Sequence, residues 1–179
     1  MAEFLWIFWS FSLLGWVLER LFAAVTRSPR QRRRCLLLLP LCPVYGLGMA
    51  AVLALPPSLR SGWPLYLWGG LTATSVEYIY HWWGETFLSV SFWDYTGVFG
   101  NLRGRVCLPF SLAWGLLLFP AVYLVTPPVL ALADRVPVGV TWWLLLAFTA
   151  DAVCSLRFLA VTHDLEALRA VIWPVSADR

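Results

Sequence analysis

The sequence has no lysine and few charged residues of any kind. Charged residues make up 13% of its 179 positions, against roughly 25% in an ordinary soluble domain. Hydrophobic residues make up 60% of the chain, and the mean hydropathy is +0.73. This composition excludes an ordinary soluble domain and indicates an integral membrane protein, for which we expect no nucleic-acid partner.

Other absences narrow the function. Neither a Walker A nor a Walker B sequence is present, so ATP hydrolysis would require a separate ATPase chain. The cysteines show no C-x-x-C spacing, and none lies in a predicted external loop. We therefore expect no disulfide framework and interpret them as small buried residues. The sequence identifies no cofactor and leaves metal binding open.

Five apolar stretches are long enough to cross a bilayer, which takes about 20 residues in a helix. They cover residues 4–25, 35–55, 65–88, 106–125 and 140–161. The segments between them are short and leave no room for a soluble domain. The sequence therefore predicts one all-α integral membrane domain over residues 1–179, built as a bundle of five transmembrane helices.

The arginines predict how these helices are oriented. Five arginines lie within residues 27–34, and Arg103 and Arg105 lie between the third and fourth helices. The other two loops carry only Arg60 and Arg135. By the positive-inside rule the arginine-rich loops are cytoplasmic. We expect a multi-pass protein of the cell membrane, such as a bacterial inner membrane, with its N-terminus outside and its C-terminus in the cytoplasm.

Several charged residues fall inside the predicted helices: Glu19, Glu77, Glu85, Asp151 and Arg157. An unpaired charge at the centre of a bilayer costs at least about 2.5 to 3.5 kcal/mol, so these side chains should face protein or water. Glu77, His81 and Glu85 are spaced by four residues, which places them along one side of a helix. That side should point into the bundle, with the acidic groups in the cytoplasmic half of the membrane.

The carboxylates need cationic partners, and the segment Phe92–Arg105 can supply one. We predict that this segment is a re-entrant loop whose Asp94, Asn101 and Arg105 meet the carboxylates of the helices. Irregular backbone is tolerated at membrane depth where it is buried in protein or lines a cavity. Glycines at positions 97, 100 and 104 allow the tight turns that such a loop requires.

Several short motifs add a resemblance to a known family. The longest run from W-D-Y at residues 93–95 through N-x-x-G-R-V-C-L at 101–108 to S-x-x-W-G at 111–115. L-G-W-x-x-E at 14–19, C-P-V-Y-G-L-G at 42–48 and E-Y at 77–78 accompany them. Together they resemble the putative ABC-transporter type IV membrane family over roughly the first 125 residues. The resemblance implies a presumed permease.

The motifs and the buried charges together define a candidate substrate or ion site. Its members are Glu19, Glu77, His81, Glu85, Asp94, Tyr95, Asn101, Arg105, Ser111 and Asp151.

Three functions are compatible with such a site. In a transport component, Glu77 and Glu85 bind protons or cations and Arg105 contacts an anion. In a membrane enzyme acting on a lipid or isoprenoid, the same glutamates with His81 and Asp94 provide acid, base or metal-ligand groups. In a scaffold or assembly subunit, the polar groups only join helices. Expected partners are membrane lipids, a second copy or another membrane subunit, and a separate ATPase chain.

Overall fold

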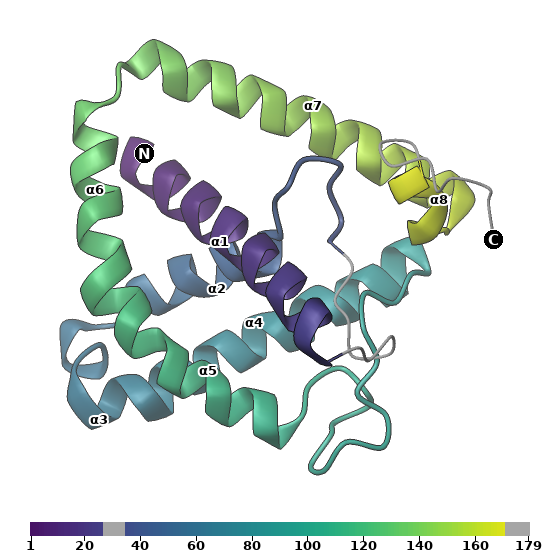
Figure 1. The fold of residues 1–179 in the computed structure, drawn as a ribbon, viewed down its shortest axis with the longest axis horizontal. Helices are drawn as coiled ribbons and strands as arrows, with labels where there is room; N and C mark the ends of the chain where they lie inside the picture. Colours follow the sequence, from purple (N-terminus) through teal and green to yellow (C-terminus); the bar gives the residue numbers. More distant parts are fainter. Residues whose placement is uncertain (27–34, 171–179) are drawn as a thin grey trace.

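The computed structural model describes residues 1–26 and 35–170, which form helices joined by irregular segments (Figure 1). Three helical runs within these ranges are long and apolar enough to cross a membrane: Ala2–Val25, Leu108–Arg135 and Val138–Thr162. The first and the last correspond to α1 (Ala2–Thr26) and α7 (Val138–Thr162). Their bounds lie close to those predicted for the first and fifth transmembrane helices.

The third predicted helix is part of a longer helical run that extends from Gly62 to Leu88. It follows a short 3₁₀ turn, η1 (Pro57–Leu59), and consists of α3 (Gly62–Pro64), η2 (Leu65–Gly69), α4 (Gly70–Trp83) and η3 (Gly84–Leu88). The segments η2 and η3 are π-helical turns, which widen the helix locally and are frequent at functional sites. Gly70 lies close to the backbone of Gly115, so α4 and the next long helix can approach closely.

The fourth helix is longer than the sequence predicts, because it continues through two consecutive prolines. It runs through α5 (Leu108–Pro120), the π-helical η4 (Ala121–Val125) and α6 (Thr126–Arg135). The predicted helix ended at Val125, two residues before Pro127, and proline inside a helix removes a hydrogen bond. Proline is nevertheless favoured in the first turn of a helix, and Pro127 and Pro128 occupy that position in α6. Thr126 donates its side-chain hydroxyl to the carbonyl of Ala121 at 2.8 Å, and the same carbonyl also accepts the backbone N–H of Thr126.

The second predicted helix, over residues 35–55, is wrong in its first part. Helix α2 covers only Pro43–Leu53, and residues 35–42 are irregular. Pro40 and Pro43 explain the difference, since proline disfavours the helical conformation in the residue before it, and Cys42 is extended. At about 1.5 Å per residue, the 11 residues of α2 are too short to cross a bilayer alone.

Other parts of the chain satisfy the polar backbone of residues 35–42. The Asp151 carboxylate accepts hydrogen bonds from the backbone N–H groups of Leu38 at 3.1 Å and Leu39 at 2.9 Å. The N–H of Cys42 donates to the carbonyl of Ser12 at 2.9 Å. Irregular backbone inside a membrane protein requires such partners, so Asp151 stabilises this segment from α7.

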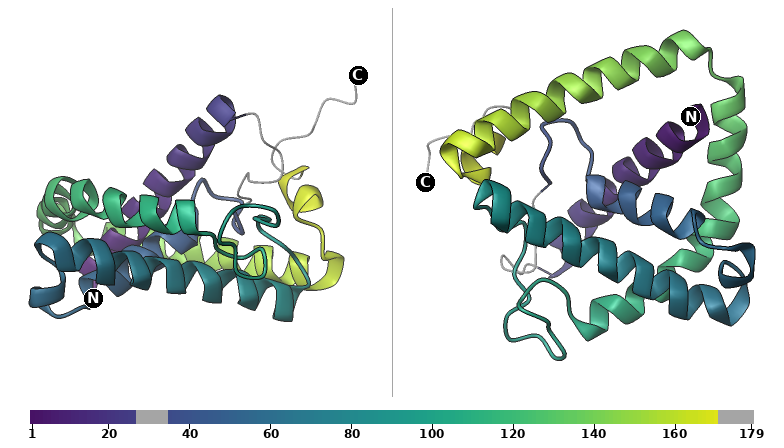
Figure 2. Two further views of the ribbon diagram at one scale, coloured as in Figure 1. Left: turned by 90° about the horizontal axis from the view of Figure 1, so that it is seen from below. Right: turned by 180° about the vertical axis from the view of Figure 1, so that it is seen from behind.

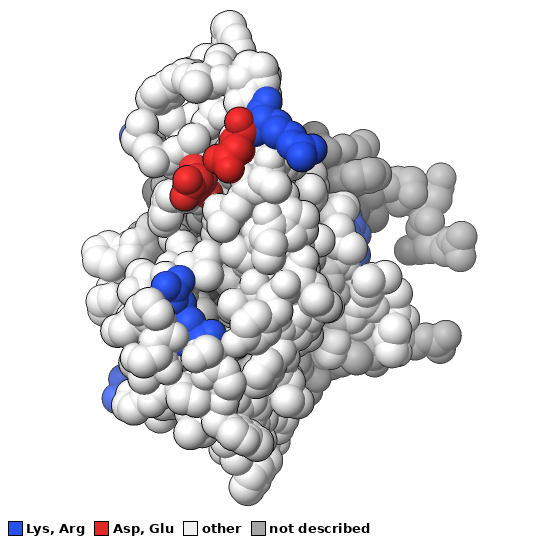
Figure 3. Space-filling model, turned by 90° about the vertical axis from the view of Figure 1, so that its left-hand side faces the viewer, with Lys and Arg blue, Asp and Glu red and all other residues white. Residues whose placement is uncertain are grey.

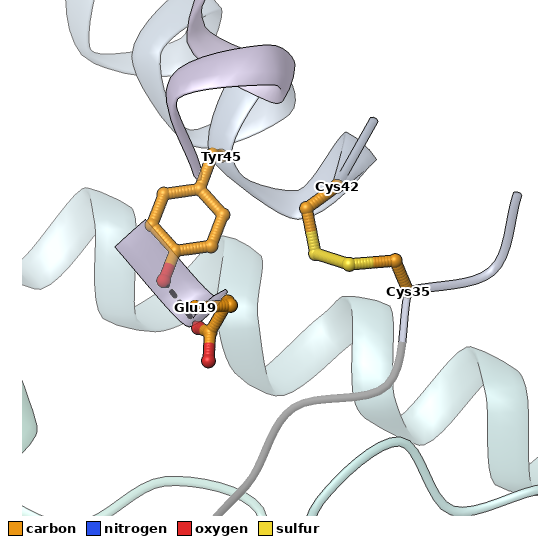
Figure 4. The surroundings of a disulfide bond; sticks show 4 residues. All are labelled: Glu19, Cys35, Cys42 and Tyr45. Carbon is orange, nitrogen blue, oxygen red and sulfur yellow. Dashed lines mark hydrogen bonds between the residues drawn. A yellow bond between two sulfur atoms is a disulfide. The ribbon is translucent and has the colours of Figure 1, made fainter. Parts of the chain in front are cut away.

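A disulfide joins Cys35 to Cys42, and the prediction of no disulfide is therefore wrong (Figure 4). A helix would separate these residues by about 10 Å along its axis. The irregular segment brings their Cα atoms to 5.0 Å, within the range a disulfide requires. Cys35 and Cys42 are 8% and 3% exposed, so packing shields the bond from external thiols.

Replacing both cysteines should destabilise the protein. Because the bond closes a short loop, the double variant Cys35→Ser/Cys42→Ser should lose about 2 to 3 kcal/mol of unfolding free energy. Denaturant unfolding in detergent measures this loss. The matched control is Cys154→Ser, which removes an exposed free cysteine and should change nothing. Equal stability of the double variant and the parent would contradict the structural role of the bond.

Helices α1, α4 and α7 run from one end of the molecule toward the other, and α6 lies across the first end (Figures 1 and 2). At one end, Trp6 Nε1 donates to Thr141 Oγ1 at 3.1 Å, and the Gly62 N–H donates to the Tyr123 hydroxyl at 3.3 Å. At the other end, His163 Nδ1 contacts the carbonyl oxygen of Leu88 at 2.6 Å, just before the short helix α8 (Leu165–Ala170). Residues 89–107 and the C-terminal helix therefore lie at the end opposite the N-terminus. Seen from its left-hand side, the surface is largely uncharged (Figure 3).

Candidate functional site

The charged side of α4 and η3 forms the centre of the candidate site. Glu77 and His81 are each 1% exposed, whereas the Glu85 side chain is 35% exposed. His81 Nε2 lies 3.2 Å from Glu85 Oε1 and 3.2 Å from the hydroxyl of Ser91. The spacing of four residues therefore places a buried glutamate, a buried histidine and a half-exposed glutamate in sequence along the helix.

Arg105 forms an ion pair with the exposed end of this row. Its Nε donates to Glu85 Oε2 at 2.7 Å, and its Nη1 donates to the Tyr78 hydroxyl at 2.8 Å. The guanidinium carbon also lies 5.1 Å from the centre of the Tyr78 ring. Burial alone would lower the pKa of Arg105, but the hydrogen bonds and charges of Glu85 and Tyr78 raise it overall. Arg105 is therefore protonated and binds two partners, Glu85 through Nε and Tyr78 through Nη1.

Aromatic hydrogen-bond donors hold Glu77. The Tyr95 hydroxyl donates to Glu77 Oε1 at 3.3 Å, and Trp114 Nε1 donates to Glu77 Oε2 at 2.6 Å. Both donors come from outside α4, since Tyr95 lies in the loop and Trp114 in α5. Hydrogen bonds to a buried carboxylate offset part of its desolvation cost, so the loop and α5 together stabilise Glu77 at the bundle interior.

The loop over residues 89–107 is folded into the protein along its first part and exposed at its tip. Phe92, Trp93 and Tyr95 are buried, and Trp93 Nε1 donates to the carbonyl of Arg105 at 2.7 Å. Asn101 Oδ1 accepts the N–H of Gly104 at 3.2 Å, which shapes the turn before Arg105. The buried aromatic residues thus anchor the loop and position Arg105 beside Glu85.

Two cavities of about 250 and 220 Å³ adjoin these residues. The larger lies between α1, α2, α4 and the α5–η4 helix and has Glu77 in its wall. The smaller has Glu19 in its wall, and Glu19 accepts a hydrogen bond from the Tyr45 hydroxyl (Figure 4). Glu19 and Glu77 therefore open onto neighbouring spaces, although they come from different helices.

Three predicted members of the site make other contacts. Asp151 binds the backbone of residues 38 and 39, so it does not belong to the group around Glu85. Ser111 donates its hydroxyl to the carbonyl of Cys107 at 3.0 Å within its own helix. Asp94 accepts the N–H of Thr96 at 2.8 Å within its own turn. Within residues 1–26 and 35–170, no three His, Cys, Asp or Glu side chains form a group that could hold a metal ion.

The sequence-based prediction did not include several uncharged hydrogen-bond partners of the charged groups. Tyr45 and Trp114 donate to the carboxylates of Glu19 and Glu77. Tyr78 accepts a hydrogen bond from Arg105. All three residues lie within the sequence motifs. Tyr45 is part of C-P-V-Y-G-L-G, Tyr78 directly follows Glu77 in E-Y, and Trp114 is part of S-x-x-W-G. A buried carboxylate needs hydrogen-bond donors, and tyrosine and tryptophan supply them with little added charge. The motifs thus contain both the carboxylates and their donors.

A family model described as putative ABC-transporter type IV matches residues 6–156. The matched range extends from the start of α1 into the second half of α7 and contains every residue of the site described above. No curated protein and no solved structure matches the chain.

Proposed function

The chain belongs to the putative ABC-transporter type IV family, and on that premise we propose that it is the membrane-embedded component of a transporter. In this proposal Glu77, His81 and Glu85 are proton-binding groups that couple proton movement to transport. Arg105 holds the charge of Glu85 at the end of the row. A separate ATPase chain or a second membrane subunit completes the transporter.

The row of titratable groups between an exposed ion pair and a buried cavity supports this proposal. Glu85 is partly exposed, His81 follows one helical turn deeper, and Glu77 lines the larger cavity. His81 Nε2 contacts Glu85, whereas its buried Nδ1 has no hydrogen-bond partner among the described residues. An imidazole can accept a proton at one nitrogen and release one from the other. Chains of Asp, Glu and His in membrane proteins serve as proton relays.

Proton flux into proteoliposomes tests this function. With an imposed membrane potential and a pH-sensitive dye inside the vesicles, the parent protein should admit protons faster than protein-free vesicles. Glu77→Gln removes the carboxylate at the cavity and should reduce the flux to the protein-free rate, while keeping a side chain of similar size. The matched control is Asp134→Asn in α6, an exposed carboxylate away from the site.

Two results would contradict the proposal. One is a parent flux equal to that of protein-free vesicles. The other is an unchanged flux in Glu77→Gln. A Glu77→Gln protein that only melts earlier, with no flux in the parent, would favour the scaffold function. Conversion of an added lipid or isoprenoid by the purified parent would favour the enzyme.

A further inference from the structure

The two cavities share a partition of four side chains, Leu18, Tyr45, Trp114 and Leu117, of which two are aromatic. Tyr45 and Trp114 line both spaces, and their rings meet edge to face with centroids 5.1 Å apart. Each also holds one carboxylate, since Tyr45 donates to Glu19 and Trp114 donates to Glu77. A ligand that reaches this partition therefore meets both carboxylates and two aromatic faces.

The larger cavity is suited to an apolar chain. Apart from Glu77, its wall consists mainly of aliphatic and aromatic side chains, including Leu14, Leu18, Met49, Leu117 and Val125. Leu14, Leu18 and Leu117 are also exposed on the outer surface of the helices, where a bilayer would surround them. Such a cavity can admit a molecule sideways from the lipid.

The smaller cavity is suited to a cationic head group. Its wall combines Glu19 with the aromatic residues Phe22, Tyr45, Tyr95, Phe110 and Trp114. Aromatic faces attract ammonium ions, and cages of such rings bind quaternary and alkylated amines. A carboxylate only accepts hydrogen bonds, so the group that faces it must be a donor. An ammonium group meets both conditions.

We propose that the two cavities together bind a lipophilic amine from the bilayer, with its apolar chain in the larger cavity and its ammonium group between Glu19 and Glu77. The inference rests on the proposed function, because it names the substrate class of that transporter. Tyr45 and Trp114 then act as a partition that must separate when the ligand passes, which exchanges their hydrogen bonds to the carboxylates for contacts with the ammonium group.

Three probes with the same chain test the head group: dodecylamine, dodecanol and dodecanoate. Native mass spectrometry of the purified protein in detergent counts the molecules bound at each probe concentration. Dodecylamine should bind at concentrations at least about tenfold lower than dodecanoate, whose negative charge faces two carboxylates. Glu19→Gln and Glu77→Gln should each reduce the preference for dodecylamine over dodecanol. Equal binding of the three probes, or a stronger binding of dodecanol, would overturn the ammonium assignment.

Gly48 provides a test of the cavity that leaves both carboxylates in place. It lines the larger cavity, and a Cβ built there meets no atom within 4 Å. Gly48→Leu should fill the space and weaken dodecylamine binding about tenfold or more, and Gly48→Ala should have a smaller effect. The matched control is Gly139→Leu at the start of α7, where a Cβ also meets open space. Parent-like binding by a Gly48→Leu protein that melts normally would overturn the cavity assignment.

Equilibrium binding and proton flux separate the two proposals. Selective dodecylamine binding without proton flux would leave the site standing and refute the transport function. Proton flux without dodecylamine binding would refute the site and leave the transport function standing. If Gly48→Leu fails to fold, Gly48→Ala decides the cavity assignment, since an alanine inside a helix with free space around its Cβ is compatible with the structure.

Discussion

Arg105→Ala is expected to abolish proton flux and to lower the melting temperature of the protein by about 5 °C or more. The substitution removes the two side-chain hydrogen bonds of Arg105, one to Glu85 in η3 and one to Tyr78 in α4. It also leaves the Glu85 carboxylate next to His81 without its guanidinium partner. Thermal unfolding in detergent and the vesicle assay measure the two effects.

A second substitution shows whether the unpaired charge of Glu85 causes the loss of melting temperature. In the double variant Arg105→Ala/Glu85→Gln the charge of Glu85 is removed together with its partner, so part of the lost melting temperature should return. Arg105→Lys should recover less activity than the parent, because an ammonium group cannot reproduce the planar donors that reach both partners. Arg135→Ala, an exposed arginine at the end of α6, is the control and should change neither quantity. Arg105→Ala with parent-like melting and flux would show that the loop is not coupled to the charged row.

The charged row and its link to Arg105 could be predicted because both follow from local rules. Residues four apart share one side of a helix, and buried charges in membrane proteins need partners. These two rules place Glu77, His81 and Glu85 together and direct Arg105 toward them. The uncharged partners do not follow from a count of charges. Tyr45 and Trp114 donate to the carboxylates, and Tyr78 accepts from Arg105, without changing the charge.

The irregular segment at residues 35–42 could not be predicted from hydropathy. Its leucines look like those of a spanning helix, and only Pro40 and Pro43 indicate a break. Distant parts of the chain stabilise the irregular segment. The carboxylate of Asp151 and the carbonyl of Ser12 accept hydrogen bonds from its backbone. Asp151 was grouped with the glutamates because it lies at a similar predicted depth. Depth alone does not identify the partner of a buried charge.

The contact between α1 and α2 positions Glu19, one of the two carboxylates that line the cavities. Gly46 in α2 lies against the backbone of α1, where the Phe8 carbonyl oxygen and the buried Ser12 hydroxyl leave no space for a Cβ. One residue earlier on α2, Tyr45 lies over Gly15 and donates to Glu19 on α1. Close packing at Gly46 therefore brings the Tyr45 hydroxyl within reach of Glu19.

Gly46→Ala is accordingly expected to destabilise the protein by about 1 to 3 kcal/mol, the usual cost of overpacking. The added methyl group meets backbone, which cannot rotate away, so α2 must shift and carry Tyr45 with it. Gly48→Ala is the matched control, two residues along the same helix, where the Cβ meets open space. There the higher helix propensity of alanine should stabilise the protein by up to about 1 kcal/mol. Denaturant unfolding of the two variants measures both changes. Gly46→Ala should also weaken dodecylamine binding, because the shift of α2 displaces Tyr45 from the wall of the smaller cavity. A Gly46→Ala protein as stable as Gly48→Ala would show that α1 and α2 do not pack at this distance.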